Sequence, residues 1–503
     1  MENICTFVGR KRSHGNVAKR NDNEAKQNSM ENTSVQGIKQ IIASQRTFFA
    51  SDATRDISFR RKMLKTLLAA IQKWEKPLCD ALWQDMHKSY EEAYLTEISI
   101  LYGEIRQHLK HLRSWTRKQS RPTPLKLFPS RSYVQSMPLG CSLIIAPWNY
   151  PVQLLLNPLV GAISSGCTAI LKPSPYVPSV AKVLGEMISE SFRPEYVAIV
   201  QGNREVNQAL LAERHDLIFF TGSPVLGKQV MRAAAEHLTP VVLELGGKSP
   251  CIVDKDADIQ VAAKRIAWGK TLNCGQTCIA PDYLILHASV KEAFIKAFAQ
   301  QIKQLHGDDI AKSPHYVRMV NQKAYHRVSD YLSQGKLRYG GRLEAEERFI
   351  EPALLDEVSP ESPVMQEEIF GPVFPIITFD EATDSSSEAN SGAKKSFADQ
   401  VVDFVNAREH PLAFYYFGNE KRAWKVLERC ISGGACINDT IMHIANEKMT
   451  FGGVGHSGMG AYHGRKSFEV FSHQRSVIAT GTWIDLPFRY MPYKLFKLAK
   501  KLI

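Results

Sequence analysis

The chain has 503 residues, of which 44% are hydrophobic and 23% are charged, a composition typical of a globular protein with two or three domains. It contains no run of about 18 apolar residues, so no helix is expected to span a membrane. The nine cysteines lack the spacing of a disulfide framework, and no His cluster lies near the closely spaced pairs Cys274/Cys278 and Cys430/Cys436. We therefore expect a reducing compartment and no metal site.

The formal net charge of +12 is partly concentrated at the two ends of the chain. The basic residues there are Arg10, Lys11, Arg12, Lys19 and Arg20 near the start and Lys494, Lys497, Lys500 and Lys501 near the end. Binding to nucleic acid would explain this charge, but no nucleic-acid motif accompanies it. We therefore expect no nucleic-acid partner.

Residues 1–34 are polar and show no repeating apolar period, which predicts a disordered tail. They lack the apolar core of a secretory signal, so we expect a cytoplasmic location. Met30-Glu31-Asn32 repeats the pattern of Met1-Glu2-Asn3, which leaves open whether the native protein starts at Met1 or at Met30.

Helical and strand-like patterns alternate after this tail. Apolar positions recur at helical spacing from Phe59 to Trp74 and again from Ala93 to Trp115. Five short β-rich runs follow, separated by helical stretches, at 142–146, 168–171, 196–200, 217–221 and 241–243. This alternation predicts a parallel sheet with helices on both faces, and a similar series from residue 250 to 440 predicts a second α/β domain.

Two short segments carry residues suited to covalent chemistry on a carbonyl group. Cys278 ends the segment LNCGQTC, and Glu244 opens the segment ELGGK. A thiolate can attack an aldehyde, and a carboxylate can then activate water to release the acyl group. Taken singly, Cys278 could equally be a small apolar filler and Glu244 a surface or helix-capping carboxylate.

Six sequence blocks resemble those of the aldehyde dehydrogenases and occur in the same order: PWNYP from Pro147, KPS from Lys172, FTGS from Phe220, ELGGK from Glu244, GQTC from Gly275 and EIFGP from Glu368. The segments 280–283 and 451–469 are most similar to the class 3 branch, which oxidises fatty and aromatic aldehydes. The resemblance covers residues 35 to 480 and implies a homodimer.

The fold that this resemblance implies has a Rossmann-type cofactor domain, an α/β catalytic domain and a small oligomerisation β element. The expected NAD(P)-binding domain is 35–243, with an oligomerisation hairpin near 125–140. The expected catalytic domain is 244–440, and a return segment with an oligomerisation strand occupies 441–490.

The resemblance assigns Cys278 as the nucleophile, the Asn149 amide and the Cys278 N–H as oxyanion donors, and Glu244 as the base that activates water, with Glu368 a weaker candidate for that base. Retention of Glu244 favours a free carboxylic acid as product. Two alternatives remain: an enzyme that transfers the acyl group to form a thioester, and a protein that binds NAD(P) without turnover. From local sequence alone, Asn149 could also be a plain turn residue.

The cofactor is expected to be NAD or NADP, although a G-x-G-x-x-G fingerprint is not found. A strand followed by a turn and a helix offers free N–H groups to a pyrophosphate. The residues assigned to the cofactor are Lys172, Thr221, Gly222, Ser223, Gly227, Leu245, Glu368 and Phe370. For Lys172 and Glu368 the alternative is a solvated surface charge, and for Phe370 a core aromatic. Pro175 stands where the family commonly has Glu, which removes a carboxylate that would repel the 2′-phosphate of NADP.

Tyr150 and Phe451 are assigned by resemblance to an apolar substrate tunnel, though either could be a core residue. Cys274 either replaces a small Ser-like residue or forms a disulfide with Cys278 on oxidation. The sequence does not determine which aldehyde is oxidised, because tunnel shape depends on residues that are scattered along the chain.

The C-terminal segment 491–503 alternates apolar and lysine residues and is a candidate basic amphipathic helix. Such a helix either lies on an anionic membrane surface or packs on a partner subunit or frays in solvent. A Ser-, Glu- and Asn-rich stretch at 384–392 is expected to be a surface insertion.

Overall fold

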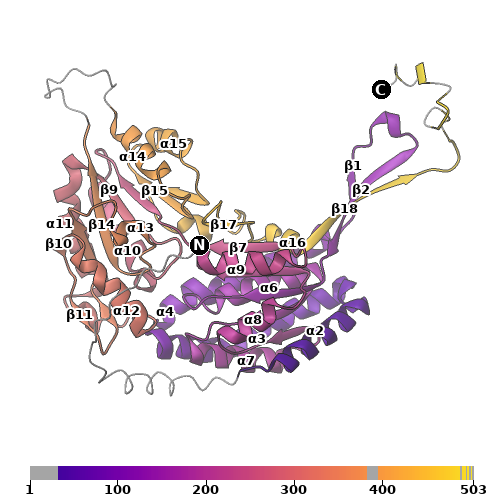
Figure 1. The fold of residues 1–503 in the computed structure, drawn as a ribbon, viewed down its shortest axis with the longest axis horizontal. Helices are drawn as coiled ribbons and strands as arrows, with labels where there is room; N and C mark the ends of the chain where they lie inside the picture. Colours follow the sequence, from indigo (N-terminus) through magenta and orange to yellow (C-terminus); the bar gives the residue numbers. More distant parts are fainter. Residues whose placement is uncertain are drawn as a thin grey trace, which may run out of the picture.

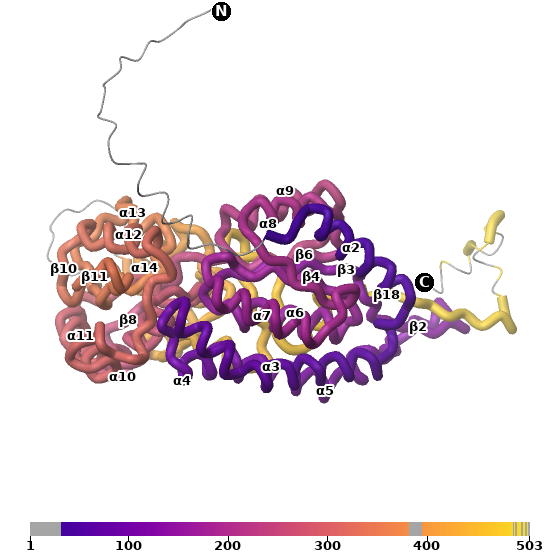
Figure 2. Tube along the Cα trace, turned by 90° about the horizontal axis from the view of Figure 1, so that it is seen from below, coloured from indigo at the N-terminus to yellow at the C-terminus, as the bar shows by residue number. Residues whose placement is uncertain are grey.

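The computed structural model describes residues 32–381, 395–485, 487, 490–493, 496–497 and 500. Two α/β bodies lie side by side, and a narrow β arm projects from one of them (Figures 1 and 2). The tail up to residue 31, the alternative start at Met30 and the insertion at 384–392 lie outside the described residues, as does most of segment 491–503. No helix within the described part of the chain is long and apolar enough to cross a membrane.

The first body contains a six-stranded sheet in the order β17-β7-β6-β3-β4-β5. Its five parallel strands are β3 (Cys141–Ile145), β4 (Thr168–Lys172), β5 (Val197–Ile199), β6 (Leu217–Gly222) and β7 (Val241–Leu245), and the short β17 (Gly458–Met459) runs antiparallel to β7. These are the five β-rich runs that the sequence predicts, within two residues at most ends. They are buried along nearly their whole length and are mostly apolar, because helices cover both faces.

Two separate apolar cores form on the two faces of this sheet. One face packs against α2 (Val35–Ala50), α8 (Arg204–Leu211) and α9 (Pro224–Ala235). The other packs against α6 (Gln153–Ser165), α7 (Pro178–Ser191) and α16 (Arg465–Val470), which α3 (Ile57–Met86) and α5 (Ser99–Trp115) cover in turn. Along β3, Leu143 and Ile145 enter the first core and Ile144 enters the second, as the two-residue period of a strand requires.

The second body contains a seven-stranded sheet in the order β10-β13-β14-β9-β8-β15-β16. The strands are β8 (Pro250–Val253), β9 (Tyr283–His287), β10 (Lys336–Tyr339), β13 (Ala353–Asp356), β14 (Val373–Phe379), β15 (Ala413–Phe417) and β16 (Gly434–Ile437). All pairs are parallel except β10 with β13. The main helices around the sheet are α10 (Ile259–Thr271), α11 (Lys291–His306), α12 (Gln322–Ser329), α14 (Phe397–Asn406) and α15 (Glu420–Leu427).

Three expected boundaries differ from the structure. A division between 243 and 244 would cut β7, which continues to Leu245 because its pairing with β6 extends to Gly222↔Leu245. Part of the return segment also belongs to the first sheet, through the pairing of β17 with β7. Residues 32–34 belong to the folded part, since the N–H of Thr33 donates to the carbonyl of Gln201 at 3.0 Å and Ser34 caps α2.

The arm is a three-stranded antiparallel sheet of β1 (Gln119–Arg121), β2 (Ser130–Pro138) and β18 (Ser472–Thr480). The long pair β2 and β18 joins segments that lie far apart in the sequence, with register from Ser130↔Thr480 to Pro138↔Ser472. Both views show this arm extending away from the two bodies (Figures 1 and 2). The expected hairpin near 125–140 and the expected strand within 441–490 meet here.

Candidate functional site

The order of strands in the first sheet creates a crevice at its carboxyl edge. From β3 the chain proceeds outward to β4 and β5 on one side, and then returns to place β6 and β7 on the other. Ligands of open α/β sheets bind at such a switch point, outside the carboxyl ends of the strands. Asn149 follows β3, Ser223 follows β6, and Glu244 lies near the end of β7. Three separated motifs therefore converge at one edge.

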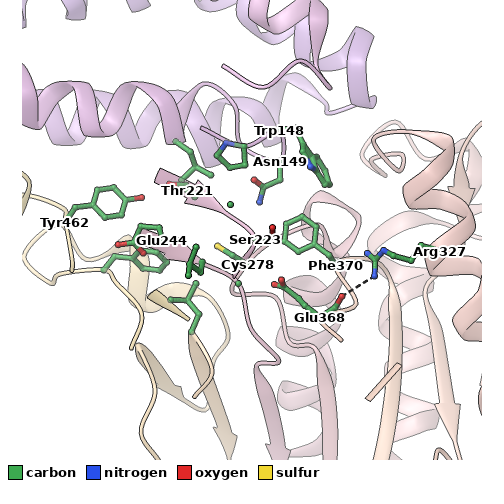
Figure 3. A pocket seen from close by; sticks show the side chains of 17 residues that line it. Trp148, Asn149, Thr221, Ser223, Glu244, Cys278, Arg327, Glu368, Phe370 and Tyr462 are labelled. Atoms are coloured by element: carbon green, nitrogen blue, oxygen red, sulfur yellow. Dashed lines mark hydrogen bonds between the residues drawn. The ribbon is translucent and has the colours of Figure 1, made fainter. Parts of the chain in front are cut away.

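The second sheet faces this crevice with its amino ends. Cys278 precedes β9, Glu368 and Phe370 precede β14, and Leu412 precedes β15. Between the two sheets lies a cavity of about 250 Å³ (Figure 3). It is lined by Pro147, Trp148, Asn149, Leu154, Thr221, Gly222, Ser223, Glu244, Leu245, Gly246, Cys278, Arg327, Glu368, Phe370, Leu412, Phe451 and Tyr462. The structure thus brings Cys278, Glu244 and Asn149 together in one cavity.

The loop that carries Cys278 is held in an unusual backbone conformation. Asn273, Cys274 and Gly275 have φ values of 52°, 56° and 71°, in the left-handed region that favours glycine. A Cβ at Gly275 would stand 2.4 Å from the carbonyl oxygen of Gly371. The amide of Gln276 fixes the next turn, because its Nε2 donates to the carbonyls of Asn273 and Arg318 at 3.1 Å. Such strain persists only where surrounding contacts determine it.

The thiol of Cys278 lies partly buried in an acidic setting. Burial, and to a smaller extent the nearby carboxylates of Glu368 and Glu244, raise the pKa of Cys278 to about 12. In Figure 3 its sulfur lies between Glu244 on one side and Glu368 and Phe370 on the other. The thiol is therefore protonated in the ligand-free protein at neutral pH and must lose its proton before it can react.

Glu244 is a buried carboxyl on a strand and not a surface or capping residue. Its exposed fraction is 2%, and burial raises its pKa well above the ordinary range. Within the described part of the chain, neither carboxyl oxygen has a hydrogen-bond partner. Burying a carboxyl without a hydrogen-bond partner lowers the stability of the fold, so such a group is expected mainly where it has a chemical role. A raised pKa is suited to general-base chemistry near neutral pH.

Glu368 is the second carboxyl in the cavity. Its pKa is raised to about 8, mainly by burial and then by Asp282. Gly246 permits its position, since a Cβ there would stand 2.0 Å from Oε2 of Glu368. Its Oε1 is buried and, in the described residues, has no hydrogen-bond partner. Glu368 can therefore accept a hydrogen bond from a ligand in the cavity.

The amide of Asn149 is aimed by the loop that carries the nucleophile. Asn149 is 2% exposed, and its Nδ2 donates to the carbonyl of Gln276 at 3.1 Å. Its backbone carbonyl accepts from Asn273 Nδ2 at 2.9 Å and from Lys88 Nζ at 3.1 Å. Asn149 is therefore more than a turn residue, because both ends of it are tied to the segment around Cys278.

The cavity has features that fit a nicotinamide dinucleotide. Thr221 Oγ1 and Glu368 Oε1 are buried polar atoms that no other described residue satisfies, and both belong to residues that line the cavity. Ser223 caps α9, whose N-terminal turn opens beside the cavity. Gly227 lets α9 approach β7 closely, since a Cβ there would meet Leu245 Cδ2 at 2.7 Å. Hydroxyl-rich and anionic groups can be held by such a set.

Lys172 is not a solvated surface charge, which was the alternative to a cofactor contact. It ends β4 with an exposed fraction of 1%, and burial lowers its pKa to about 8. Its Nζ donates to the carbonyl of Pro173 at 2.8 Å. The residue lies at the carboxyl edge of the first sheet but does not line the cavity around Cys278. Its cofactor role stays a prediction.

The two expected tunnel residues have different positions. Phe451 lines the cavity beside Tyr462, with ring centroids 6.0 Å apart. Tyr150 does not line it: the phenol oxygen lies 2.6 Å from Thr277 Oγ1, and Lys88 Nζ lies 4.2 Å from its ring centroid. The substrate role of Tyr150 stays a prediction.

Cys274 is fully buried, and its sulfur contacts Tyr316 Oη at 3.5 Å and Met319 Sδ at 3.9 Å. Burial raises its pKa to about 12, which suppresses the thiolate that a disulfide exchange needs. The packing supports the small-residue alternative for Cys274.

Seven lining residues are absent from the sequence-based assignments: Pro147, Trp148, Leu154, Gly246, Arg327, Leu412 and Tyr462. Trp148 packs edge-to-face on Phe370 at 5.4 Å, and Phe370 itself has a φ of 50°. Arg327 holds this loop by donating to the carbonyls of Glu368 at 3.2 Å and Ile369 at 2.7 Å (Figure 3). Trp148 and Tyr462 lie within motifs and could have been included. Arg327 comes from α12, where no local pattern marks it.

Comparison with known proteins supports a common family. The aldehyde dehydrogenase family model matches residues 11–477. The chain is 44% identical to the 4,4'-diaponeurosporen-aldehyde dehydrogenase of Staphylococcus aureus (strain NCTC 8325 / PS 47), over 91% of this chain and 97% of that one. It is 42% identical to aldehyde dehydrogenase family 3 member A2 of Mus musculus, over 87% of each chain. It is 39% identical to the dimeric NADP-preferring aldehyde dehydrogenase of Canis lupus familiaris, over 90% of this chain and 98% of that one.

The solved structures give the same result. The substrate-bound Staphylococcus aureus AldH superposes with a TM-score of 0.88 at 44% identity, covering 92% of this chain and 99% of that chain. The expected fold, with its parallel α/β sheets and covering helices, is confirmed by this likeness.

Proposed function

The chain belongs to the aldehyde dehydrogenase family, in its family 3 branch, and on that premise we propose that Cys278, Glu244 and Asn149 carry its chemistry. The enzyme oxidises aldehydes to carboxylic acids with NAD or NADP. The observation that carries the proposal is the convergence of these three side chains on one cavity from three separate loops and strands.

Cys278 is the nucleophile in this proposal. Its sulfur attacks the aldehyde carbon and forms a thiohemiacetal, and the negative charge that develops on the oxygen needs preorganised donors. The Asn149 amide and the Cys278 N–H supply them. A dinucleotide held in the cavity would supply the hydride acceptor that oxidation of this adduct needs. The proposed dinucleotide contacts are Lys172, Thr221, Gly222, Ser223, Gly227, Leu245, Glu368 and Phe370.

Glu244 acts after oxidation, when a thioester links the acyl group to Cys278. It takes a proton from water, the water oxygen attacks the thioester carbon, and the acid leaves as the Cys278 thiolate is restored. Free carboxylate oxygens, without protein partners among the described residues, support this role. Retention of Glu244 disfavours transfer of the acyl group to another thiol, and a non-catalytic role would leave its buried carboxyl without a task.

An apolar aldehyde is the substrate class that the lining favours. Leu154, Leu412, Phe451 and Tyr462 line the cavity, and Tyr462 lies on the same side of Cys278 as Glu244 (Figure 3). Reduced-nicotinamide formation with short, medium and long aliphatic and aromatic aldehydes tests this, with NAD and NADP in parallel. We expect medium, long or aromatic aldehydes to give the highest kcat/KM. A preference for acetaldehyde would contradict the apolar assignment.

Pro175 is expected to permit the use of NADP. Replacing it by Glu puts back a carboxylate near the expected ribose site, so NADP should lose about tenfold or more in kcat/KM while NAD changes little, because like charges repel. Pro175→Gln is the matched neutral control. In the unmodified enzyme, a preference for NAD over NADP of more than about a hundredfold, roughly 2.7 kcal/mol, would contradict the proposal.

Glu368 is expected to set the reactivity of the Cys278 thiol in the cofactor-free enzyme. Above pH about 8 its ionised carboxylate raises the pKa of Cys278, so Glu368→Gln should lower that pKa and shift alkylation of Cys278 to lower pH. The measurement is the rate of iodoacetamide labelling against pH, followed by mass spectrometry of the Cys278 peptide. Glu367→Gln, at the exposed neighbouring carboxylate, is the control and should leave the profile unchanged. Identical profiles for all three proteins would exclude this electrostatic effect.

A homodimer is proposed for the assembly. β16 ends the second sheet and β18 ends the arm, so within the described chain each has one unpaired edge, and such edges pair readily with another chain. Trp424 and Ile431 beside β16 remain 54% and 57% exposed. One relative carries the word dimeric in its name, and a solution mass of two chains would support the same state here.

A cytoplasmic location with peripheral membrane contact through 491–503 is also proposed. Its lysines would each contribute about 1 kcal/mol near an anionic surface. The full chain should float with phosphatidylserine-containing liposomes, and a chain that lacks 491–503 should not float with them. Neutral liposomes are the control. Equal flotation of both proteins would exclude membrane contact through 491–503, and the segment would then either pack on a partner subunit or fray in solvent.

A further inference from the structure

A buried ion pair lies beneath the turn that carries Asn149. Lys88 Nζ lies 2.8 Å from Glu97 Oε1, and both side chains have an exposed fraction of 0%. Glu97 lies in a π-helical turn, Tyr94–Ile98, which connects α4 (Tyr90–Ala93) and α5. Removing two charges from water is costly and rarely stabilises a fold, and π-helical turns are frequent at functional sites. We therefore expect this ion pair to have a function other than stabilising the fold.

The cationic half of the pair holds the carbonyl side of the turn. Lys88 Nζ donates to the backbone oxygen of Asn149 at 3.1 Å and lies 4.2 Å from the ring centroid of Tyr150. The same oxygen accepts from Asn273 Nδ2 at 2.9 Å. The backbone of Asn149 is therefore fixed from two directions, by Lys88 and by the loop that precedes Cys278.

The anionic half holds the amide side of the turn. Glu97 Oε2 accepts from the N–H of Val152 at 2.8 Å and from that of Gln153 at 3.2 Å, at the N-terminus of α6. A carboxylate is favoured at that end of a helix. Lys88 and Glu97 thus hold both sides of the segment 149–153. The attraction between their charges fixes the positions of the two contacts relative to each other.

We propose that Lys88 and Glu97 are positioning residues that hold the Asn149 amide at the oxyanion site of Cys278. The inference rests on the proposed function, because it presupposes that Asn149 stabilises the oxyanion. Neither residue lines the cavity, so each acts only through Asn149. A displacement of about 1 Å at such a donor can cost about 100-fold in rate.

The test uses Lys88→Met/Glu97→Gln, which removes both charges of the pair together. We expect kcat/KM for an aldehyde to fall about 100-fold, while alkylation of Cys278 by iodoacetamide changes less than about twofold, because alkylation develops no oxyanion. Asn149→Ala should cost about 10²- to 10³-fold alone but less than about tenfold in the double variant, since both act through one amide. Lys291→Met, which breaks an ion pair with Asp356, is the control and should retain activity.

The outcomes separate the inference from the proposed function. Equal losses in kcat/KM and alkylation, or additive effects of Asn149→Ala, would overturn the positioning role. A second variant, Lys88→Gln/Glu97→Gln, keeps a donor for the Asn149 carbonyl and should recover about tenfold in kcat/KM. If neither variant folds into a dinucleotide-binding protein, the pair is structural and the inference is wrong. Full activity of Asn149→Ala alone would instead overturn the oxyanion assignment in the proposed function.

Discussion

Cys278→Ala is expected to abolish aldehyde oxidation while leaving the folded, dinucleotide-binding protein intact. Loss of the nucleophile in covalent catalysis costs on the order of 10⁶-fold in kcat, which puts the variant at background. The sulfur is the only thiol that lines the cavity, so no neighbouring cysteine in the described chain can replace it. Reduced-nicotinamide formation with the best aldehyde of the panel measures the loss.

The matched control for this result is Cys436→Ala. Cys436 is also partly buried but contacts His443 Nδ1 at 3.3 Å and lies outside the cavity. Its variant should keep activity within about twofold. Dinucleotide affinity, measured by fluorescence titration, should be the same for all three proteins. Substantial turnover by Cys278→Ala would show that the oxidation proceeds without a thiohemiacetal on this residue.

Glu244→Gln is expected to stop the reaction after oxidation and before release of the acid. The variant should form one equivalent of reduced nicotinamide per site in a rapid burst and then turn over about 10²- to 10⁴-fold more slowly, because the water lacks its base. The acyl group should accumulate on Cys278, where mass spectrometry of the intact protein detects it. Glutamine preserves the size of the side chain on β7, so the strand pairing should survive.

Glu368→Gln distinguishes the two candidate bases. If Glu244 is the base, the Glu368 variant should weaken dinucleotide binding without accumulating an acyl enzyme. If the acyl enzyme accumulated in the Glu368 variant and the Glu244 variant turned over normally, Glu368 and not Glu244 would be the base that activates water. A Glu244 variant with no burst would place its function before oxidation, at removal of the Cys278 proton.

Much of the first body is predictable because its signals are local. The mostly apolar runs at 142–146, 168–171, 217–221 and 241–243 correspond to β3, β4, β6 and β7, since a strand covered on both faces is apolar over most of its length. Helix α2 lies outside the two helical stretches that the sequence predicts, although Ile38 and Ile42 recur at helical spacing and are buried in the first core.

Several residues gained their setting only from packing. Lys172 and Glu244 are charged types that sequence alone would place at the surface, yet their exposed fractions are 1% and 2%. Arg327 has no motif around it, and its contact with the Glu368 loop depends on how α12 packs. Tyr150 lies beside a catalytic motif residue but points to Thr277 and Lys88, away from the cavity lining.

The sequence by itself determined the family, the alternation of helices and strands, and the chemical types needed for covalent oxidation of an aldehyde. It did so because periodicity, turn chemistry and ordered motifs are properties of neighbouring residues. The tertiary structure alone decided that Asn149, Glu244 and Cys278 share one cavity, and that Lys88 and Glu97 brace it from beneath. Those relations depend on strand order and on the facing of two sheets, which bring together residues that are far apart along the chain.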